Sequence, residues 1–288
     1  MKPLRIIGRL DIKGPNLIKG INFEGLRVLG NPVSFALKYY DEGIDEIFLY
    51  DSVASLYNRN SLDQLIKDIS KSVFVPITAS GGIRGLIDIK RVLDAGADKI
   101  CLNTAAINNP DLINQAVSRY GSSTILIAID YVKDLDGVYK CLIENGREIT
   151  NINAVDWAIE VEQRGVGEII LTSVKHEGLM QGLDIEFIEN ISSKVKIPIT
   201  VHGGIGNVNH IIPMLGIKNI SGISMASLLH YNYLASIEEK HEKIEGNKSF
   251  ISQKMNVAKY FEEGSLERTN IKMIKSKLNY DGVLIRND

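Results

Sequence analysis

Residues 5–20 read RIIGRLDIKGPNLIKG, and this stretch decides where the rest of the chain lies. It begins as an apolar, β-branched run, typical of a buried strand, and continues through glycine, proline and asparagine, typical of a loop. Side chains alternate along a strand, so Arg5, Arg9 and Asp11 point to the same side. An unpaired buried charge costs several kcal/mol, so a buried strand tolerates a face with these charged side chains only where that face lines a functional interior. The alternative is an edge strand with Arg5 and Arg9 in solvent.

Length and composition are compatible with one large α/β domain. The chain has 288 residues with 44% hydrophobic content, enough for one (β/α)8 barrel of about 250 residues or for two domains of ordinary size. The net charge of −2 gives no general preference for nucleic acid or an anionic membrane. Cys101 and Cys141 lie far apart and form no CxxC pair, so we expect neither a disulfide framework nor a zinc site, and no cofactor.

The apolar runs indicate the cellular location. Residues 1–5 reach a charge before any long apolar run begins, unlike a signal peptide, and no run of about 18 uncharged apolar residues occurs. We therefore expect a cytoplasmic protein without membrane contact.

Short β-rich runs alternate with segments of helical periodicity. Eight strands alternating with helices favour a parallel sheet, and eight is the number that closes a barrel. The sequence therefore predicts an α/β fold, a (β/α)8 TIM barrel, with a doubly wound open sheet as the alternative. The expected strands are 5–11, 45–51, 74–79, 98–103, 123–130, 167–173, 197–202 and 220–226, and the expected helices are 32–41, 61–69, 87–95, 110–119, 154–164 and 185–191.

The two halves of the chain resemble each other at a fixed offset. Residues 45–51 (DEIFLYD) match residues 167–173 (GEIILTS) 122 positions later, and residues 76–83 (PITASGGI) match residues 198–205 (PITVHGGI) at the same offset. Two matches at one offset predict a barrel built from two similar half-barrels.

This doubling brings two carboxylates and two glycine turns to one end of the barrel. The first and fifth strands lie opposite each other, so Asp11 and Asp130 would face across the C-terminal mouth, where barrel enzymes carry their chemistry. The glycine pairs at 81–82 and 203–204 can bring backbone N–H groups close to an anion, because glycine has no Cβ. Two such turns imply two phosphates.

The regular alternation ends near His230. Residues 231–270 form a charged, amphipathic helical stretch that is longer than the last helix of a barrel requires. We expect residues 1–288 to form a single barrel domain with a helical insertion at about 231–270, in which residues 247–252 are the most mobile part.

Short motifs on the expected strands are shared with one barrel family. They are Leu10-Asp11-Ile-Lys13, Lys19-Gly20, Asp51, Gly81-Gly82-Ile83, Gly96-Ala-Asp98-Lys99, Asn103-Thr104-Ala-Ala106, Ala128-Ile-Asp130, Glu168-Ile-Ile-Leu-Thr-Ser173, Gly203-Gly204 and Ala226-Ser227. On these motifs the chain, outside residues 231–270, resembles the cyclase subunit of imidazole glycerol phosphate synthase, a histidine-biosynthesis barrel.

The resemblance implies a reaction and its catalytic residues. Asp11 and Asp130 would be the general acid and base of a cyclase that uses ammonia to convert phosphoribulosyl-formimino-AICAR phosphate (PRFAR) to imidazole glycerol phosphate and AICAR. Two opposed carboxylates can move protons on two sides of one substrate if their environments differ. Lys19, on the loop after the first strand, would close over the substrate as a lid cation.

The resemblance also implies the binding residues. Asp51 and Thr172, at strand ends, would hydrogen-bond the substrate or Asp130. The substrate's two phosphates would be held at one end by Gly82, Asn103 and Thr104, and at the other by Gly178, Gly204, Ala226 and Ser227.

A partner follows from the same resemblance. A separate glutaminase (glutamine amidotransferase) subunit would bind the N-terminal face of the barrel, near Asp98, and form a heterodimer that delivers ammonia. No nucleic acid or membrane is implied. Ammonia would enter through a ring of alternating charges formed by Arg5, Glu46, Lys99 and Glu168.

Three side chains at the expected mouth depart from the family pattern. Arg9 stands where a small residue is usual, and would either pair with an interior acid such as Glu46 or Asp51 or contact the substrate. His202 replaces a smaller residue, and Glu177 replaces an aspartate. These changes leave an alternative open, in which the barrel delivers ammonia for amidation of a nucleotide-linked sugar in surface polysaccharide biosynthesis. The retained pair of aspartates favours the cyclase.

Overall fold

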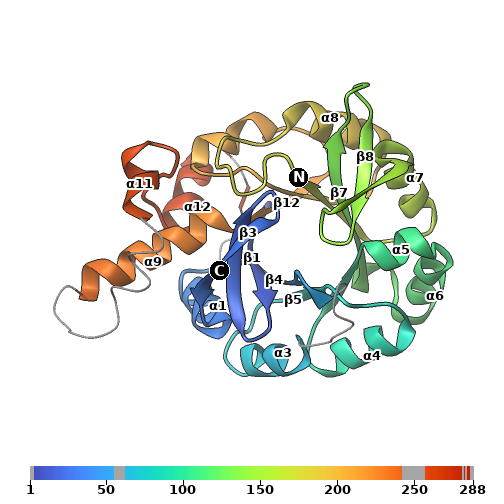
Figure 1. Ribbon diagram of the computed structural model, residues 1–288, viewed down its shortest axis with the longest axis horizontal. Coiled ribbons are helices and arrows are strands. Elements are labelled where there is room, and N and C mark those ends of the chain that lie inside the picture. Colours follow the sequence, from blue (N-terminus) through green and yellow to red (C-terminus); the bar gives the residue numbers. More distant parts are fainter. Residues whose placement is uncertain (1–2, 55–61, 242–256, 281, 283, 286–288) are drawn as a thin grey trace.

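Eight parallel strands form a closed ring at the centre of the molecule (Figure 1). The computed structural model describes residues 3–54, 62–241, 257–280, 282 and 284–285. The pairing of β10 with β7 closes the ring, so the predicted barrel is confirmed and the open sheet is wrong. In ring order the strands are β1 (Arg5–Lys13), β4 (Glu46–Asp51), β5 (Ile77–Ser80), β6 (Lys99–Leu102), β7 (Ile125–Lys133), β10 (Glu168–Ser173), β11 (Ile199–His202) and β12 (Ile220–Met225).

The helices form an outer layer around this ring (Figure 1). Helix α1 shows how the sequence begins one of them: the Asn31 side chain accepts a hydrogen bond of 2.8 Å from the N–H of Val33, and Pro32 occupies the first helical position. The larger helices are α1 (Pro32–Asp41), α3 (Leu62–Ser70), α4 (Leu86–Asp94), α6 (Asp111–Tyr120), α7 (Ala154–Gln163), α8 (Ile185–Lys194), α9 (Ser227–His241) and α12 (Ile271–Tyr280), with the short α5 (Thr104–Asn108) and α11 (Val257–Glu262) between them.

Strand β1 divides its side chains between two cores. Ile6 and Leu10 are fully buried in the large cluster between the strands and the helices. Ile7 packs in a second cluster inside the barrel, together with Phe48, Cys101 and other inward-facing residues. The interior of the ring is therefore filled by side chains, and the space available to small molecules lies at its ends.

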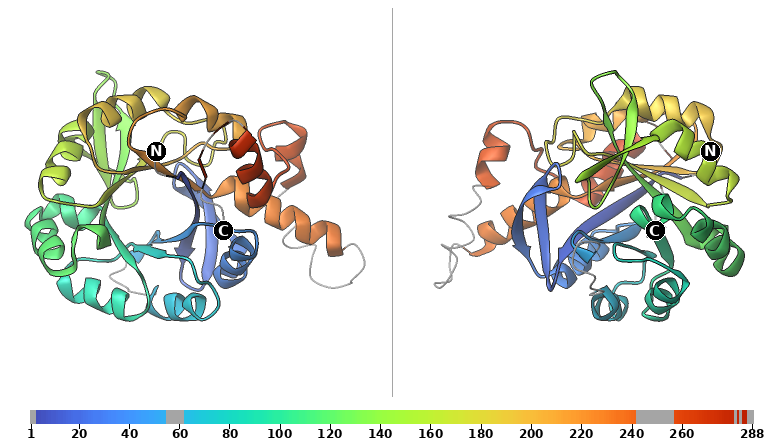
Figure 2. Two further views of the ribbon diagram at one scale, coloured as in Figure 1. Left: turned by 180° about the vertical axis from the view of Figure 1, so that it is seen from behind. Right: turned by 45° about the vertical axis from the view of Figure 1, so that its right-hand side comes forward.

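Each half of the barrel carries an antiparallel hairpin after its first strand (Figure 2). Strands β2 (Asn16–Ile21) and β3 (Glu24–Gly30) follow β1, and strands β8 (Tyr139–Ile143) and β9 (Glu148–Asn153) follow β7. The next helices, α1 and α7, begin 122 residues apart, each capped by an asparagine side chain. The expected division into two similar halves thus extends to the hairpins, which were not predicted.

The first hairpin corrects the prediction that Lys19 lies on a loop. Gly14, with φ of 61°, forms the turn after β1, and Leu17 and Ile18 then pair with β1 and are almost completely buried. Lys19 lies in β2, because these two apolar residues continue the sheet where glycine and proline indicated irregular structure.

The C-terminal helices pack beside the barrel. Helix α9 begins at Ser227 and extends away from the barrel wall (Figure 2), and the rings of Tyr231 and Tyr260 stack with centroids 5.2 Å apart. Residues 247–252, expected to be mobile, lie outside the described residues. A helical insertion at about 231–270 within one domain stays a prediction.

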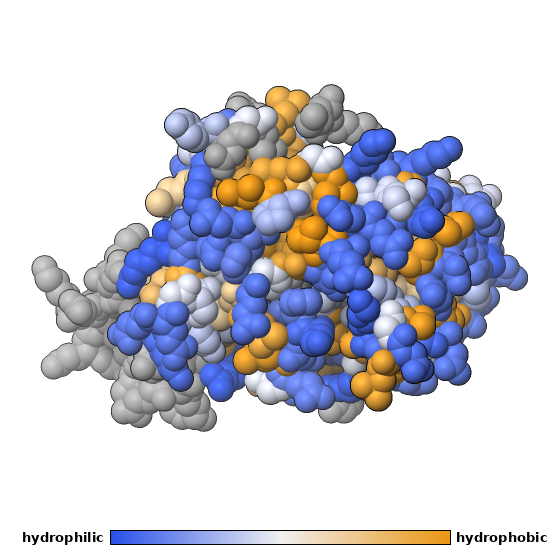
Figure 3. Space-filling model, turned by 90° about the horizontal axis from the view of Figure 1, so that it is seen from above, coloured by the Kyte–Doolittle hydropathy of each residue, from blue (hydrophilic) through white to orange (hydrophobic). Residues whose placement is uncertain are grey.

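The surface in Figure 3 is mainly hydrophilic, with apolar side chains gathered in patches between the charged ones. Within the described part of the chain, no helix has the length and apolar character that crossing a membrane requires.

Candidate active site

Asp11 and Asp130 lie at the same end of the barrel, near the C-terminal ends of β1 and β7. These strands are four positions apart in the ring of eight, so the two residues come from opposite walls. Both side chains are buried, with relative exposures of 4% and 1%. The fold thus brings the two predicted catalytic residues to one mouth.

Two cations surround Asp11. The Nε–H of Arg9 donates to Asp11 Oδ1 at 2.8 Å, and Lys19 Nζ lies 3.9 Å from Asp11 Oδ2. Burial acts to raise the pKa of Asp11, but the charges of Arg9 and Lys19 outweigh burial and hold the pKa below its usual range. Asp11 is therefore an ionised carboxylate throughout the physiological pH range.

Asp130 has a different environment. The amide of Asn103 donates to Asp130 Oδ2 at 2.7 Å, and the neighbouring strand places Thr172 beside Asp130 in register. Burial raises the pKa of Asp130 to about 6, and the positive charge of Arg9 limits this rise. A carboxyl group with a pKa near 6 can both donate and accept a proton at neutral pH.

Arg9 interacts electrostatically with both carboxylates. It points into the barrel as predicted, but it forms an ion pair with Asp11 on its own strand, whereas Glu46 pairs with Arg5 and Lys99 at the opposite end. The Arg9 guanidinium also lies against three aromatic rings, those of Phe23, Phe48 and Tyr50.

Lys19, Glu177 and His202 form a buried polar group beside Asp11. Lys19 Nζ forms an ion pair with Glu177 Oε1, which lies 3.9 Å from His202 Nε2. His202 Nδ1 is 2.9 Å from the carbonyl oxygen of Ser224 and so carries the proton. Burial lowers the pKa of His202 well below its usual value, so the ring is neutral. Lys19 is therefore buried in an ion pair, and its expected role as a lid cation over the substrate stays a prediction.

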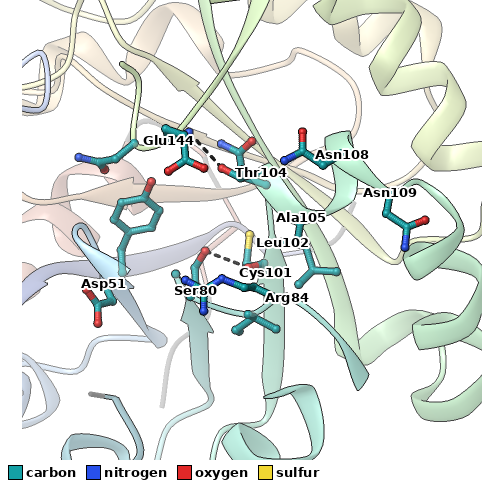
Figure 4. A pocket seen from close by; sticks show the side chains of 16 residues that line it. Asp51, Ser80, Arg84, Cys101, Leu102, Thr104, Ala105, Asn108, Asn109 and Glu144 are labelled. Atoms are coloured by element: carbon teal, nitrogen blue, oxygen red, sulfur yellow. Dashed lines mark hydrogen bonds between the residues drawn. The ribbon is translucent and has the colours of Figure 1, made fainter. Parts of the chain in front are cut away.

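A cavity of about 290 Å³ (Figure 4) is lined in part by Asn103, the residue that hydrogen-bonds Asp130. Its lining includes Asp51 and the three residues predicted to bind the first phosphate, Gly82, Asn103 and Thr104. Thr104 Oγ1 accepts a hydrogen bond of 3.0 Å from the N–H of Glu144. The three residues predicted to bind the first phosphate thus line one cavity, and phosphate binding there stays a prediction.

Sequence reasoning missed three residues that line this cavity, Arg84, Glu144 and Asn145. Glu144 and Asn145 come from the turn of the second hairpin, and the Asn145 amide is buried without a hydrogen bond to the described residues. The Asn145-Gly146 pair after an apolar run is a hairpin signal that could have placed them.

The four residues predicted to bind the second phosphate also line one pocket, namely Gly178, Gly204, Ala226 and Ser227. A Cβ on Gly204 would clash with the carbonyl oxygen of Gly182, and φ of Gly204 is 100°, so both space and backbone require glycine. The pocket has a volume of only about 10 Å³ and is bordered by Glu177 and His202.

A ring of four alternating charges closes the other end of the barrel, as predicted. Arg5 reaches Glu46 at 2.8 Å and Glu168 at 2.5 Å. Lys99 reaches Glu46 at 2.8 Å and Glu168 at 3.9 Å. Mutual pairing explains how β1 tolerates Arg5 inside a barrel.

Comparison with known proteins agrees with this arrangement. Residues 5–235 match the family model described as "Histidine biosynthesis protein", a span that includes all eight strands of the ring. The chain belongs to this family. Imidazole glycerol phosphate synthase subunit HisF of Legionella pneumophila is 47% identical over 208 residues, which are 72% of this chain and 98% of that protein. Helices α11 and α12 lie beyond the family match.

The candidate site lies within the part of the chain that matches the histidine biosynthesis protein family. All residues predicted for catalysis, phosphate binding and the charged ring lie within the matched span. Among the described residues, no three His, Cys, Asp or Glu side chains are grouped to hold a metal ion.

Proposed function

We propose that this protein is the cyclase subunit of an imidazole glycerol phosphate synthase, which uses ammonia to convert PRFAR to imidazole glycerol phosphate and AICAR. One observation carries the proposal: Asp11 and Asp130, with pKa values shifted in opposite directions, meet at a barrel mouth between two glycine-lined pockets. The 47% identity to HisF agrees with it.

The two carboxylates take different parts in the reaction. Ammonia attacks PRFAR, a C–N bond breaks to release AICAR, and ring closure gives the imidazole. Asp130, with a pKa of about 6, donates the proton that the leaving nitrogen requires and can take one back. Asp11, held ionised by Arg9, acts as the base on the opposite side. Two groups of one chemical type thereby serve as acid and base.

The phosphates fix the substrate across the mouth. One binds in the cavity lined by Gly82, Asn103 and Thr104, and the other in the pocket lined by Gly178 and Gly204. Glycine lets backbone N–H groups approach an anion closely. Because the second pocket is almost closed, we expect binding there to displace Glu177 from Lys19, which frees the lysine for the substrate.

Ammonia comes from a glutaminase subunit on the opposite face. The charged ring stands at the N-terminal end of the strands, where Arg5 and Lys99 retain side-chain exposures of 18% and 20%. Phe74, in the loop that leads into β5 at this face, is 74% exposed and provides an apolar contact for a partner. We place this complex in the cytoplasm.

The proposal is tested with purified protein, PRFAR and an ammonium salt at alkaline pH, where free ammonia is abundant. Loss of substrate absorbance with formation of imidazole glycerol phosphate and AICAR is expected. Complete inactivity of correctly folded protein would contradict the proposal.

A further inference from the structure

Arg9 is held in a cage of aromatic rings. Its guanidinium carbon lies 4.2 Å from the ring centroid of Tyr50, 5.3 Å from that of Phe23 and 5.5 Å from that of Phe48. Tyr50 and Phe48 come from β4, and Phe23 comes from the turn of the first hairpin. A guanidinium is attracted to the faces of such rings, so the cage fixes the charge without neutralising it.

Asp11 is the partner that compensates this charge. The side chain of Arg9 is 1% exposed, and its Nε–H donates to Asp11 Oδ1 at 2.8 Å. Its Nη2 makes no hydrogen bond to the described residues. A buried cation requires a buried anion nearby, and Arg9 supplies the strongest reason for Asp11 to remain ionised.

The other charged and titratable groups around the pair come from several elements. Lys19 from β2, His202 from β11 and His230 from α9 also face Asp11, and Glu177 pairs with Lys19. The thiols of Cys101 and Cys141 face Asp130, and Cys101 also faces Arg9. Asp130 faces Arg9 and Asp11 from β7, and Tyr50 faces all three from β4. Arg9 is the cation nearest to Asp11 and also acts on Asp130, whereas Lys19 is shared with Glu177.

We propose that Arg9 is the positioning residue that divides the work of the two carboxylates: it keeps Asp11 ionised and ready to act as the base, so that Asp130 carries the proton to be donated. This inference rests on the proposed function for its catalytic meaning. The arrangement itself is a property of the unliganded protein and can be measured without substrate.

Carboxyl titration by NMR tests the proposal directly. The protein is labelled with ¹³C at aspartate side chains, and the Asp11 and Asp130 signals are identified by their loss in Asp11→Asn and Asp130→Asn. We expect Arg9→Met, which keeps the apolar contacts with the cage but removes the charge, to raise the titration midpoint of Asp11 by at least one pH unit. The midpoint of Asp130 should rise as well. Unchanged midpoints in the folded variant would overturn the proposal.

Two further variants keep the test decisive. If Arg9→Met does not fold, Arg9→Gln takes its place, since glutamine offers Asp11 a hydrogen bond without a positive charge. In Arg9→Ala the emptied cage should accept free guanidinium at millimolar concentration, which returns the Asp11 midpoint toward its wild-type value. Guanidinium should not act on Arg9→Met, in which the cage is filled. Absence of rescue in folded Arg9→Ala counts against the cage.

The consequence for turnover separates this inference from the proposed function. In wild-type protein, the rate divided by the concentration of free ammonia should follow a single ionisation near pH 6, that of Asp130. In Arg9→Met, protonation of Asp11 should add a second ionisation on the acidic side of the pH–rate profile. A merely structural role of Arg9 would lower the rate at every pH without changing the profile. Wild-type protein inactive on PRFAR would refute the proposed function, while the NMR titration would still decide the role of Arg9.

Discussion

At the scale of single residues, burial and neighbouring charges give two aspartates opposite character. Asp130 has a pKa of about 6 in the folded protein, compared with 3.8 for the free side chain. The folded state therefore binds this proton more tightly than the unfolded chain does. By linkage, its contribution to stability is present at low pH and is lost as the pH rises from about 4 to about 6.

Asp130→Asn should stabilise the protein at pH 8 while it removes catalysis. Asparagine keeps the shape of the protonated carboxyl group and carries no charge to bury, so the free energy of unfolding should rise by about 2–3 kcal/mol. At pH 4 the gain should largely disappear. Urea unfolding at the two pH values measures this, with Asp41→Asn on the exposed end of α1 as the control. Equal stability of wild type and variant at pH 8 would contradict the account.

Alternation along a strand predicts some features of single residues in the site but not others. The inward direction of Arg5, Arg9 and Asp11 follows from their spacing, and so does the meeting of Asp11 with Asp130 once eight strands are counted. The pairing of Arg9 with Asp11 and the aromatic cage do not follow, because Phe23 comes from a hairpin turn that the sequence analysis did not recognise.

At the scale of elements, the first hairpin is attached to the barrel mouth by one buried ion pair. Lys19 of β2 and Glu177, in the segment after β10, each have a side-chain exposure of 1%. Such a pair contributes little over a well-packed apolar pair, but loss of one partner leaves an uncompensated charge in a dry site.

Lys19→Met should therefore lower the free energy of unfolding by about 3 kcal/mol, and Lys19→Met with Glu177→Leu should recover most of that loss. Urea unfolding of both variants measures the effect. The matched control is Lys38→Met, which breaks a half-exposed pair with Glu42 on α1 and should cost less than about 1 kcal/mol. A double variant that is no more stable than Lys19→Met would argue against the pair.

The long barrel elements were predicted closely, and the hairpins were not. Helix α1 has the predicted limits, 32–41, because asparagine, proline and a regular apolar face mark it clearly. Residues 16–30 contain repeated glycines, which obscured the strand pattern. Their strands are fixed by pairing with β1, a tertiary contact that local sequence does not reveal.

At the scale of the whole molecule, the barrel carries a ring of charged side chains at one end and the paired aspartates at the other. The ring of Arg5, Glu46, Lys99 and Glu168 closes one end, and the apolar cluster with Ile7 and Phe48 lies above it. Ammonia, small and neutral, is the species that such an interior would pass, whereas an ammonium ion would have to lose its hydration shell.

Lys99→Met should uncouple glutamine hydrolysis by a bound glutaminase from the use of ammonia at the barrel mouth. It removes one of the two cations that bridge Glu46 and Glu168 and leaves Arg5 as the other, so the ring is weakened and ammonia produced by a bound glutaminase should escape before it reaches the mouth. Turnover with added ammonium should stay within twofold of wild type, while more glutamine should be hydrolysed for each product formed. Lys90→Met, which breaks an exposed pair on α4, is the control. Unchanged coupling would remove the ring from the ammonia path.

The closed barrel was predictable because the strand count and the 122-residue offset both follow from sequence. The limits of the C-terminal helices were less predictable. Helix α9 follows directly after β12, so it begins at Ser227, before the expected start of the helical stretch.

The most direct test of the central claim is a single-turnover measurement of PRFAR with ammonium by wild-type protein, Asp11→Asn and Asp130→Asn, with products identified by mass spectrometry. Wild-type protein should form imidazole glycerol phosphate and AICAR. Each folded variant should bind PRFAR but react at least about 100-fold more slowly, because one proton transfer has lost its carrier. A rate within tenfold of wild type in either variant would show that the opposed aspartates are not the acid and base of this barrel.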